Sequence, residues 1–225
     1  MSAPLFVGIA GGSASGKTLV CDNIIRQLRD NRVVVVGLDS FYKDLRPEDS
    51  PDSYNFDHPN AFDLAELKTC LLALKARKPT AIPRYDFTTN SRIRGEQEFI
   101  ECADVVLVEG ILTLYEDDIR SLYDMRIYVE EENDVCLIRR LRRDVKERGK
   151  PYLDVLAQYE KNVKPMFDTF VHPQRKYADV IVTQGGHNKV AIDMLCRHIK
   201  SWLQENCPGT PTPWRQGACS FLSPN

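Results

Sequence analysis

The fold is decided by one stretch of the sequence, Gly11-Gly12-Ser13-Ala14-Ser15-Gly16-Lys17-Thr18. It matches the phosphate-binding pattern G-x-x-x-x-G-K-[ST], with an apolar run at residues 5–10 before it and a helical pattern after it. Glycines permit the positive φ angles that turn successive N–H groups toward one point, where the N-terminus of the following helix adds positive potential. Lys17 offers a charge to the β- and γ-phosphates, and the Thr18 hydroxyl can bind Mg²⁺. These eight residues are therefore predicted to bind a nucleoside triphosphate.

The rest of the chain alternates between predicted strands and helices. Further apolar runs rich in β-branched residues lie at 33–38, 105–108, 125–129 and 180–183, as expected for parallel strands that are covered on both faces. Helical patterns occupy residues 17–30, with Asn31 as the expected end, and 62–76, 133–147, 153–163 and 189–204. This alternation predicts an α/β fold, a three-layer sandwich.

Two segments depart from the alternation. Residues 80–101 are predicted to form an inserted β-hairpin, with a polar turn at 88–91 and with Pro83 placing the first strand at an edge. Residues 207–225 are rich in Pro, Gly, Ser and Thr without periodicity, which predicts a flexible tail. The chain is thus expected to be one domain, residues 1–206, followed by that tail.

Composition excludes several classes of protein. The net charge of −2 argues against a general nucleic-acid binder. The sequence contains no run of about 18 apolar residues, so no membrane span is expected. The N-terminus lacks the basic region and cleavage site of a signal peptide. The seven cysteines are odd in number and include no C-x-x-C, which is typical of reduced thiols in a cytoplasmic protein.

The phosphate loop alone does not distinguish GTPases, ATPases and kinases. The guanine signature Asn-Lys-x-Asp is absent, because the candidate at residues 188–191 ends in Ala191. A motor or helicase would usually need a longer chain. A small ATP-dependent kinase remains as the prediction.

Two carboxylates follow predicted strands. Asp39 comes directly after the run at 33–38, and Glu109 after the run at 105–108. Ligands of such sheets bind at the carboxyl ends of the strands, so both would face the phosphate loop if their strands flank the first one. Phosphoryl transfer to an alcohol needs a carboxylate that accepts the hydroxyl proton and an acidic group that holds Mg²⁺ through water. Asp39 fits the first role and Glu109 the second, although either could instead cap the next helix.

A run of basic residues follows: Arg139, Arg140, Arg142, Arg143, Lys146, Arg148 and Lys150. A solvated helix is the commonest meaning of such a run, and three consecutive glutamates at 130–132 weaken the case for a nucleic-acid patch. Beside a phosphate loop, the run is better interpreted as a lid, about residues 139–165, whose arginines close over the transferred phosphoryl group. The planar guanidinium binds phosphate oxygens bidentately.

From residue 6 to about 203 the chain resembles the uridine–cytidine kinase family of the P-loop NTPases. Besides the phosphate loop, the resemblance rests on Asp39-Ser40-Phe41-Tyr42, Asn55-Phe56-Asp57-His58-Pro59, Tyr85-Asp86-Phe87, Glu109-Gly110-Ile111 and Arg139-Arg140-Leu141-Arg142-Arg143-Asp144. It implies a five-stranded parallel core, a hairpin that covers the substrate, an arginine lid and usually a homotetramer. The implied reaction is ATP-dependent phosphorylation of the 5′-hydroxyl of uridine or cytidine.

The resemblance also implies residue roles. Asp39 would be the general base, Lys17, Arg143 and Arg148 would serve the phosphates, and Thr18 and Glu109 would organise Mg²⁺. The nucleoside would be held by Asp57 at the ribose hydroxyls, by Arg140 and Gln158 beside it, and by Phe56, Tyr85 and Phe87 around the base. Hairpin packing is a second interpretation of Phe56 and Phe87.

Three positions depart from the family pattern. Asn90 stands where a histidine commonly reads the pyrimidine 4-position, Lys150 where an arginine is usual, and His187 where an aspartate is often found near adenine. They bear on base choice, substrate affinity and nucleotide preference. Two alternatives stay open: a related kinase acting on another small alcohol, and a catalytically weak homologue that binds nucleotide.

Overall fold

The computed structural model describes residues 2–46, 48–50 and 54–208. The predicted tail therefore lies outside the described residues from Gly209 on. Five parallel strands form the central sheet, in the order β2-β5-β1-β6-β7. They are β1 (Leu5–Gly11), β2 (Val33–Gly37), β5 (Val105–Glu109), β6 (Met125–Glu130) and β7 (Val180–Thr183). All five predicted strands are confirmed.

Strand order corrects one expectation about the site. Glu109 lies level with Ile9 of β1 on one side and with Gly37 of β2 on the other. Thus β5 flanks β1, as expected, but β2 flanks β5 and not β1. Asp39 reaches the edge of the sheet nearest the phosphate loop because the chain continues beyond β2 into a short 3₁₀ helix, Leu38–Phe41.

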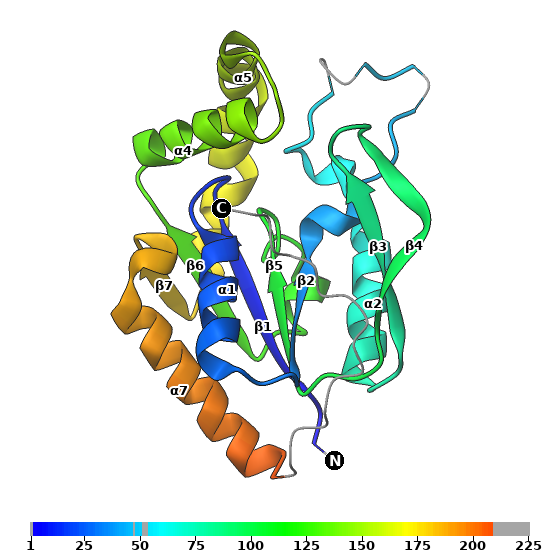
Figure 1. Cartoon of the computed structure of the whole chain (residues 1–225), viewed down its shortest axis with the longest axis vertical. Coiled ribbons are helices and arrows are strands. Elements are labelled where there is room, and N and C mark those ends of the chain that lie inside the picture. The colour runs from blue at the N-terminus through cyan, green and yellow to red at the C-terminus, as the bar shows by residue number, and fades with distance from the viewer. Residues whose placement is uncertain (1, 47, 51–53, 209–225) are drawn as a thin grey trace.

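Helices cover both faces of the sheet and complete the three-layer sandwich (Figure 1). On one face α1 (Lys17–Leu28) and α7 (Lys189–Asn206) pack with Val7 and Ile9 of β1. The other face buries Phe6 against α2 (Leu64–Lys75). Alternate residues of β1 thus enter two apolar clusters, which is why its sequence is apolar throughout. Nowhere in the described ranges is a helix both long and apolar enough to cross a membrane.

Helix boundaries differ from the pattern in two places. Helix α1 ends at Leu28 because Arg29 adopts a left-handed conformation (φ 49°) and donates its N–H to the Ile25 carbonyl, so Asn31 does not end it. The helix expected at 153–163 begins as α5 (Tyr152–Gln158) and continues through π-helical turns and α6 (Lys164–Met166) to Val171. A short helix, α3 (Asp117–Arg120), had no sequence signal.

The inserted hairpin is confirmed as a separate two-stranded antiparallel sheet of β3 (Thr80–Asp86) and β4 (Ser91–Ile100). Its register shifts between Pro83 and Tyr85, next to the residue that has no N–H to donate. Figure 1 shows the hairpin beside α2, whereas α4 (Asn133–Lys146) and α5 lie above the phosphate loop. The hairpin and the predicted lid thus stand on opposite sides of the carboxyl edge of the sheet.

Candidate active site

The phosphate loop has the backbone that its glycines predict. Gly16 has a φ of 96° and Ala14 a φ of 62°, both in the left-handed region. At Gly11, a Cβ would lie 2.4 Å from the carbonyl oxygen of Val129, so only glycine fits there. The buried Lys17 extends back along the loop and donates from Nζ to the Gly12 carbonyl at 2.9 Å. The loop is therefore shaped as an anion cradle with its lysine already in place.

Beside the loop, Thr18 and Glu109 meet. The Thr18 hydroxyl donates to Oε1 of Glu109 at 3.2 Å. Burial raises the pKa of Glu109, the charge of Lys17 opposes that shift, and the charge of Asp39 adds to it. Two hard oxygen donors next to a phosphate cradle are suited to Mg²⁺, which usually takes few protein ligands and completes its shell with phosphate and water.

One pocket brings together most of the predicted substrate side. It is lined by Ser13, Asp39, Tyr42, Phe56, Asp57, Phe87, Asn90, Ile111, Arg140, Arg143, Arg148, Lys150 and Gln158. Lys17 and Thr18 belong to the neighbouring phosphate loop, and Glu109, at the end of β5, accepts the hydrogen bond of Thr18. His187 is exposed on the turn Gly185–His187, which packs against the start of α1 and lies outside this pocket.

Asp57 is the buried carboxylate of the pocket, with 8% of its surface exposed. Burial raises its pKa, the charge of Arg140 opposes the shift, and the charge of Asp39 reinforces it. Asp39 itself is exposed toward solvent. The pocket therefore holds two carboxylates in unlike environments, one beside the phosphate loop and one enclosed.

An aromatic wall closes the hairpin side. Tyr42 stacks on Phe62 with ring centroids 4.2 Å apart and contacts Tyr85 at 5.2 Å and Phe87 at 6.1 Å. Phe56 meets the same ring edge-on at 5.9 Å and also packs on the core, whereas its contact with the base stays a prediction. The Tyr85 hydroxyl is buried without a hydrogen-bond partner among the described residues. A flat ligand with one polar edge suits such a wall.

Arg92 fastens the hairpin to the body of the protein. Its Nε donates to the Tyr42 carbonyl at 2.8 Å, its Nη1 to Glu66 at 2.6 Å, and its backbone N–H to Asp44 at 2.7 Å. Two residues earlier, Asn90 turns the hairpin with a φ of 51° and lines the pocket. These contacts hold the start of β4, and with it the turn at Asn90, against the segment that carries Tyr42.

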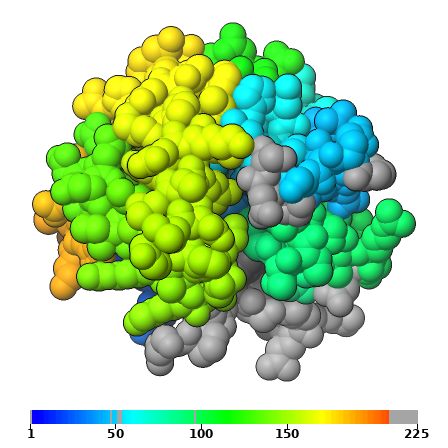
Figure 2. Space-filling model, turned by 90° about the horizontal axis from the view of Figure 1, so that it is seen from above, coloured from blue at the N-terminus to red at the C-terminus, as the bar shows by residue number. Residues whose placement is uncertain are grey.

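The lid contributes a cluster of arginines. Arg140 donates to the Ser13 hydroxyl of the phosphate loop at 2.9 Å and to Gln158 at 3.3 Å. The Arg148 guanidinium lies over the ring of Phe87, 4.7 Å from its centroid, and so links lid to hairpin. Burial lowers the pKa of Lys150, whose backbone N–H bonds the Asp144 carbonyl. Seen from above, the lid faces the hairpin across a furrow (Figure 2).

Sequence reasoning missed two pocket residues and one organising residue. Tyr42 and Ile111 line the pocket, and both lie in segments that carry the family resemblance. Asp144 gathers the arginines of the lid from behind the pocket. Its signal was its place directly after Arg143, as one of two acidic residues in a mostly basic run.

Comparisons with known proteins agree with this geometry. Residues 6–191 match the Phosphoribulokinase / Uridine kinase family. The chain is 43% identical over 208 residues to a uridine kinase of Lactobacillus helveticus, which covers 91% of this chain and 98% of that protein. It is 48% identical over 202 residues to uridine-cytidine kinase A of Dictyostelium discoideum, covering 90% of this chain but only 40% of that protein. The chain thus spans about two fifths of some relatives that it matches.

Among solved structures, phosphoribulokinase from Rhodobacter spheroides superimposes with a TM-score of 0.60 over 80% of this chain and 70% of its own. Its sequence identity of 16% makes this a likeness of fold alone.

Proposed function

Because this chain belongs to the Phosphoribulokinase / Uridine kinase family, we propose that it transfers the γ-phosphoryl group of ATP to the 5′-hydroxyl of uridine or cytidine, forming UMP or CMP. The observation that carries the proposal is the pocket in which Asp39, Asp57 and an aromatic wall meet the arginines of the lid, directly beside the phosphate loop. The carboxylate suits the ribose diol, the flat apolar wall suits the base, and the anion-binding groups suit the transferred phosphoryl group.

In the proposed mechanism, Asp39 accepts the proton of the 5′-hydroxyl as that oxygen attacks the phosphoryl group. Asp57 accepts hydrogen bonds from the ribose hydroxyls and so fixes the direction of attack. Lys17, Arg143 and Arg148 donate to oxygens on which negative charge gathers during transfer. The closed lid would exclude water, which otherwise competes with the nucleoside as acceptor.

Thr18 and Glu109 would hold Mg²⁺. When bound, this ion would neutralise charge on the β- and γ-phosphates. The burial-raised pKa of Glu109 fits this role, because a carboxylate enclosed beside Lys17 is stabilised further by a divalent cation.

Base recognition would fall to the hairpin. The Asn90 amide, which lines the pocket, offers both donors and an acceptor to the polar edge of a pyrimidine, and Tyr85 supports the wall through its contacts with Tyr42 and Phe87. His187, on the turn packed against α1, is proposed to lie near the adenine of ATP.

We further propose a cytoplasmic homo-oligomer, a tetramer by its likeness to the family. Six cysteines of the described residues are free thiols, which supports a reducing compartment. Light scattering after size exclusion gives the number of subunits directly.

The test is a panel of acceptors assayed for ATP-dependent ADP formation. We expect the highest kcat/KM with uridine or cytidine, and a marked loss with their 2′-deoxy forms, because Asp57 would lose one hydroxyl partner. A higher kcat/KM with adenosine, pantothenate, glycerate or ribulose 5-phosphate would overturn the acceptor proposed here. ATP binding without turnover on any acceptor would identify a nucleotide-binding homologue.

A further inference from the structure

Asp144, in the last turn of α4, is the carboxylate with which three arginines of the lid form ion pairs. Its residue is 0% exposed, although it carries a carboxylate. Three guanidiniums surround it: Arg143 at 2.9 Å, Arg148 at 3.4 Å and Arg140 at 3.5 Å. The sequence spacing explains the arrangement, because Arg140 lies one helical turn before Asp144 on α4 and Arg148 lies four residues after it, just beyond the end of the helix.

The charges of this cluster do not balance. Three arginines face one carboxylate, and all three arginines line the pocket whereas Asp144 does not. Asp57 and Asp39 lie on the other side of the pocket, where their charges also act on Arg140 and Arg148. Burial alone would raise the pKa of Asp144, but the charges of Arg143, Arg140 and Arg148 outweigh burial and lower it. Asp144 is therefore a fixed anion at the back of a cationic surface.

Without that anion, like charges would push the guanidiniums apart. With it, each guanidinium has an anionic partner, and Arg140 also donates to Ser13 and Gln158. The excess of positive charge is left for an anionic ligand to satisfy.

We propose that Asp144 is a positioning residue for phosphoryl transfer: it does not touch the substrate, but it sets the places of Arg140, Arg143 and Arg148, which do. This inference rests on the proposed function. It separates two properties that these arginines combine. Correct placement of the arginines in the transition state depends on Asp144. The affinity of the lid for an anionic ligand does not, because the Asp144 carboxylate and the ligand compete for the same guanidiniums.

The test is Asp144→Asn in the full chain. The amide keeps the size and one acceptor oxygen but loses the charge. We expect kcat with ATP and uridine to fall about 10- to 100-fold, the range that follows from misplaced transition-state contacts. The dissociation constant of a non-hydrolysable ATP analogue should stay equal to that of wild type or become lower. Asp134→Asn, at an exposed position in the first turn of the same helix, is the matched control and should change neither.

Two outcomes would overturn the inference. A kcat within twofold of wild type would mean that the arginines need no positioning. A parallel loss of kcat, analogue affinity and melting temperature would mean that Asp144 only supports the fold. Should Asp144→Asn not fold, Asp144→Glu carries the same test, since it keeps the charge but displaces it: kcat should fall while analogue binding persists, and unchanged kcat would refute the role. Analogue binding needs no acceptor, so it separates this result from a wrong choice of nucleoside.

Discussion

Two side chains of this site are expected to lower the stability of the fold while serving its proposed function. Asp57 and Glu109 are carboxylates whose pKa is raised chiefly by burial, so the folded protein disfavours the charge that the proposed reaction needs. A folded-state pKa above the unfolded value means that the folded state binds more protons. Stability therefore falls as pH rises through that window.

Asp57→Asn should consequently stabilise the fold and lower the catalytic efficiency with the nucleoside. We expect a higher melting temperature at pH 7 to 8, and a difference from wild type that disappears below about pH 4, where the carboxyl is protonated in both states. The nucleoside kcat/KM should fall about 5- to 150-fold, because the amide is a poorer acceptor for the ribose hydroxyls. Glu101→Gln, at an exposed position, is the control. A melting temperature below that of wild type at pH 8 would contradict the burial argument.

Asp39→Asn tests the proposed base. Only the proton acceptor is lost, so kcat should drop about 10²- to 10⁴-fold while the affinity for an ATP analogue persists. Stopped assays at saturating nucleoside measure the first quantity and equilibrium titration the second. Wild-type turnover in this variant would assign the base elsewhere.

Asn90→His tests base recognition. A histidine reaches further than an asparagine while offering one donor and one acceptor nitrogen, and it also tolerates the positive φ of this position. If Asn90 leaves the pyrimidine 4-position unpaired, the histidine should raise kcat/KM for uridine and cytidine by about 5- to 150-fold, with modest discrimination in wild type. No gain on either nucleoside would remove position 90 from base reading.

At the scale of elements, the hairpin and the lid are positioned by a few long-range contacts. The sequence predicted both, as well as the five strands, because local patterns encode each of them. It did not predict that β2 lies outside β5 or that Arg92 fastens the hairpin to Tyr42. These depend on residues far apart in the chain, such as Arg92 and Glu66, whose pairing no local period reveals.

Arg92→Lys should loosen the hairpin without unfolding the domain. An ammonium cannot bond Tyr42 and Glu66 in the same fork, and one charge-assisted hydrogen bond is worth about 1.5–3 kcal/mol. We expect the KM for the nucleoside to rise about 10-fold with little change in ATP affinity. Arg94→Lys, exposed on the same strand, should behave as wild type. An equal rise in the KM of both substrates would indicate a general loss of structure.

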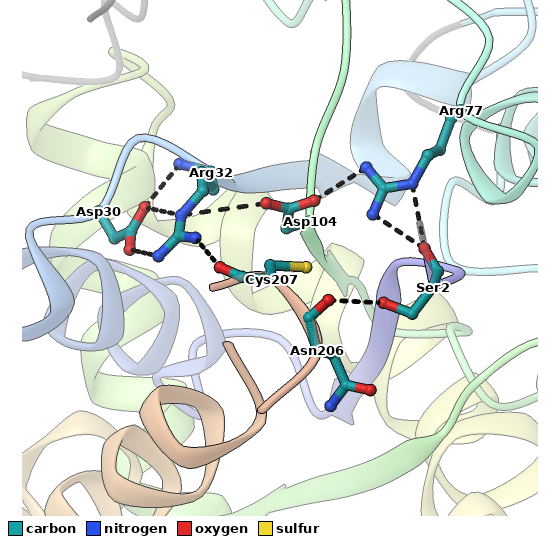
Figure 3. A network of polar contacts seen from close by, with 7 residues as sticks. All are labelled: Ser2, Asp30, Arg32, Arg77, Asp104, Asn206 and Cys207. Carbon is teal, nitrogen blue, oxygen red and sulfur yellow. Dashed lines mark hydrogen bonds and ion pairs between the residues drawn. The ribbon is translucent and has the colours of Figure 1, made fainter. Parts of the chain in front are cut away.

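In the molecule as a whole, the candidate site and a stabilising network of ion pairs lie at opposite edges of the sheet. The site lies at the carboxyl ends of the strands. Near the amino ends, Asp104 pairs with Arg77 at 2.8 Å and lies 3.9 Å from Arg32, which also bonds Asp30 and the Cys207 carbonyl (Figure 3). Ser2 completes the network through Arg77 and Asn206, which ties the first strand to the last helix.

Asp104→Asn should therefore lower stability without touching catalysis. The side chain is 16% exposed, and removing its charge leaves Arg77 without its ion pair. We expect a loss of about 1–3 kcal/mol in the free energy of unfolding, measured by urea denaturation, with unchanged kcat at a temperature where the variant is folded. Reduced kcat in the fully folded variant would show that the two edges of the sheet are coupled.

We propose that this site moves a phosphoryl group from ATP to the 5′-oxygen of a pyrimidine nucleoside. Phosphorus NMR of the reaction with ATP, Mg²⁺ and uridine tests it most directly, since it reports acceptor and position together. We expect ADP and one phosphomonoester in equal amounts, with the phosphomonoester signal split by the two 5′ protons. Inorganic phosphate as the product, or a phosphoester on another ribose oxygen, would contradict it.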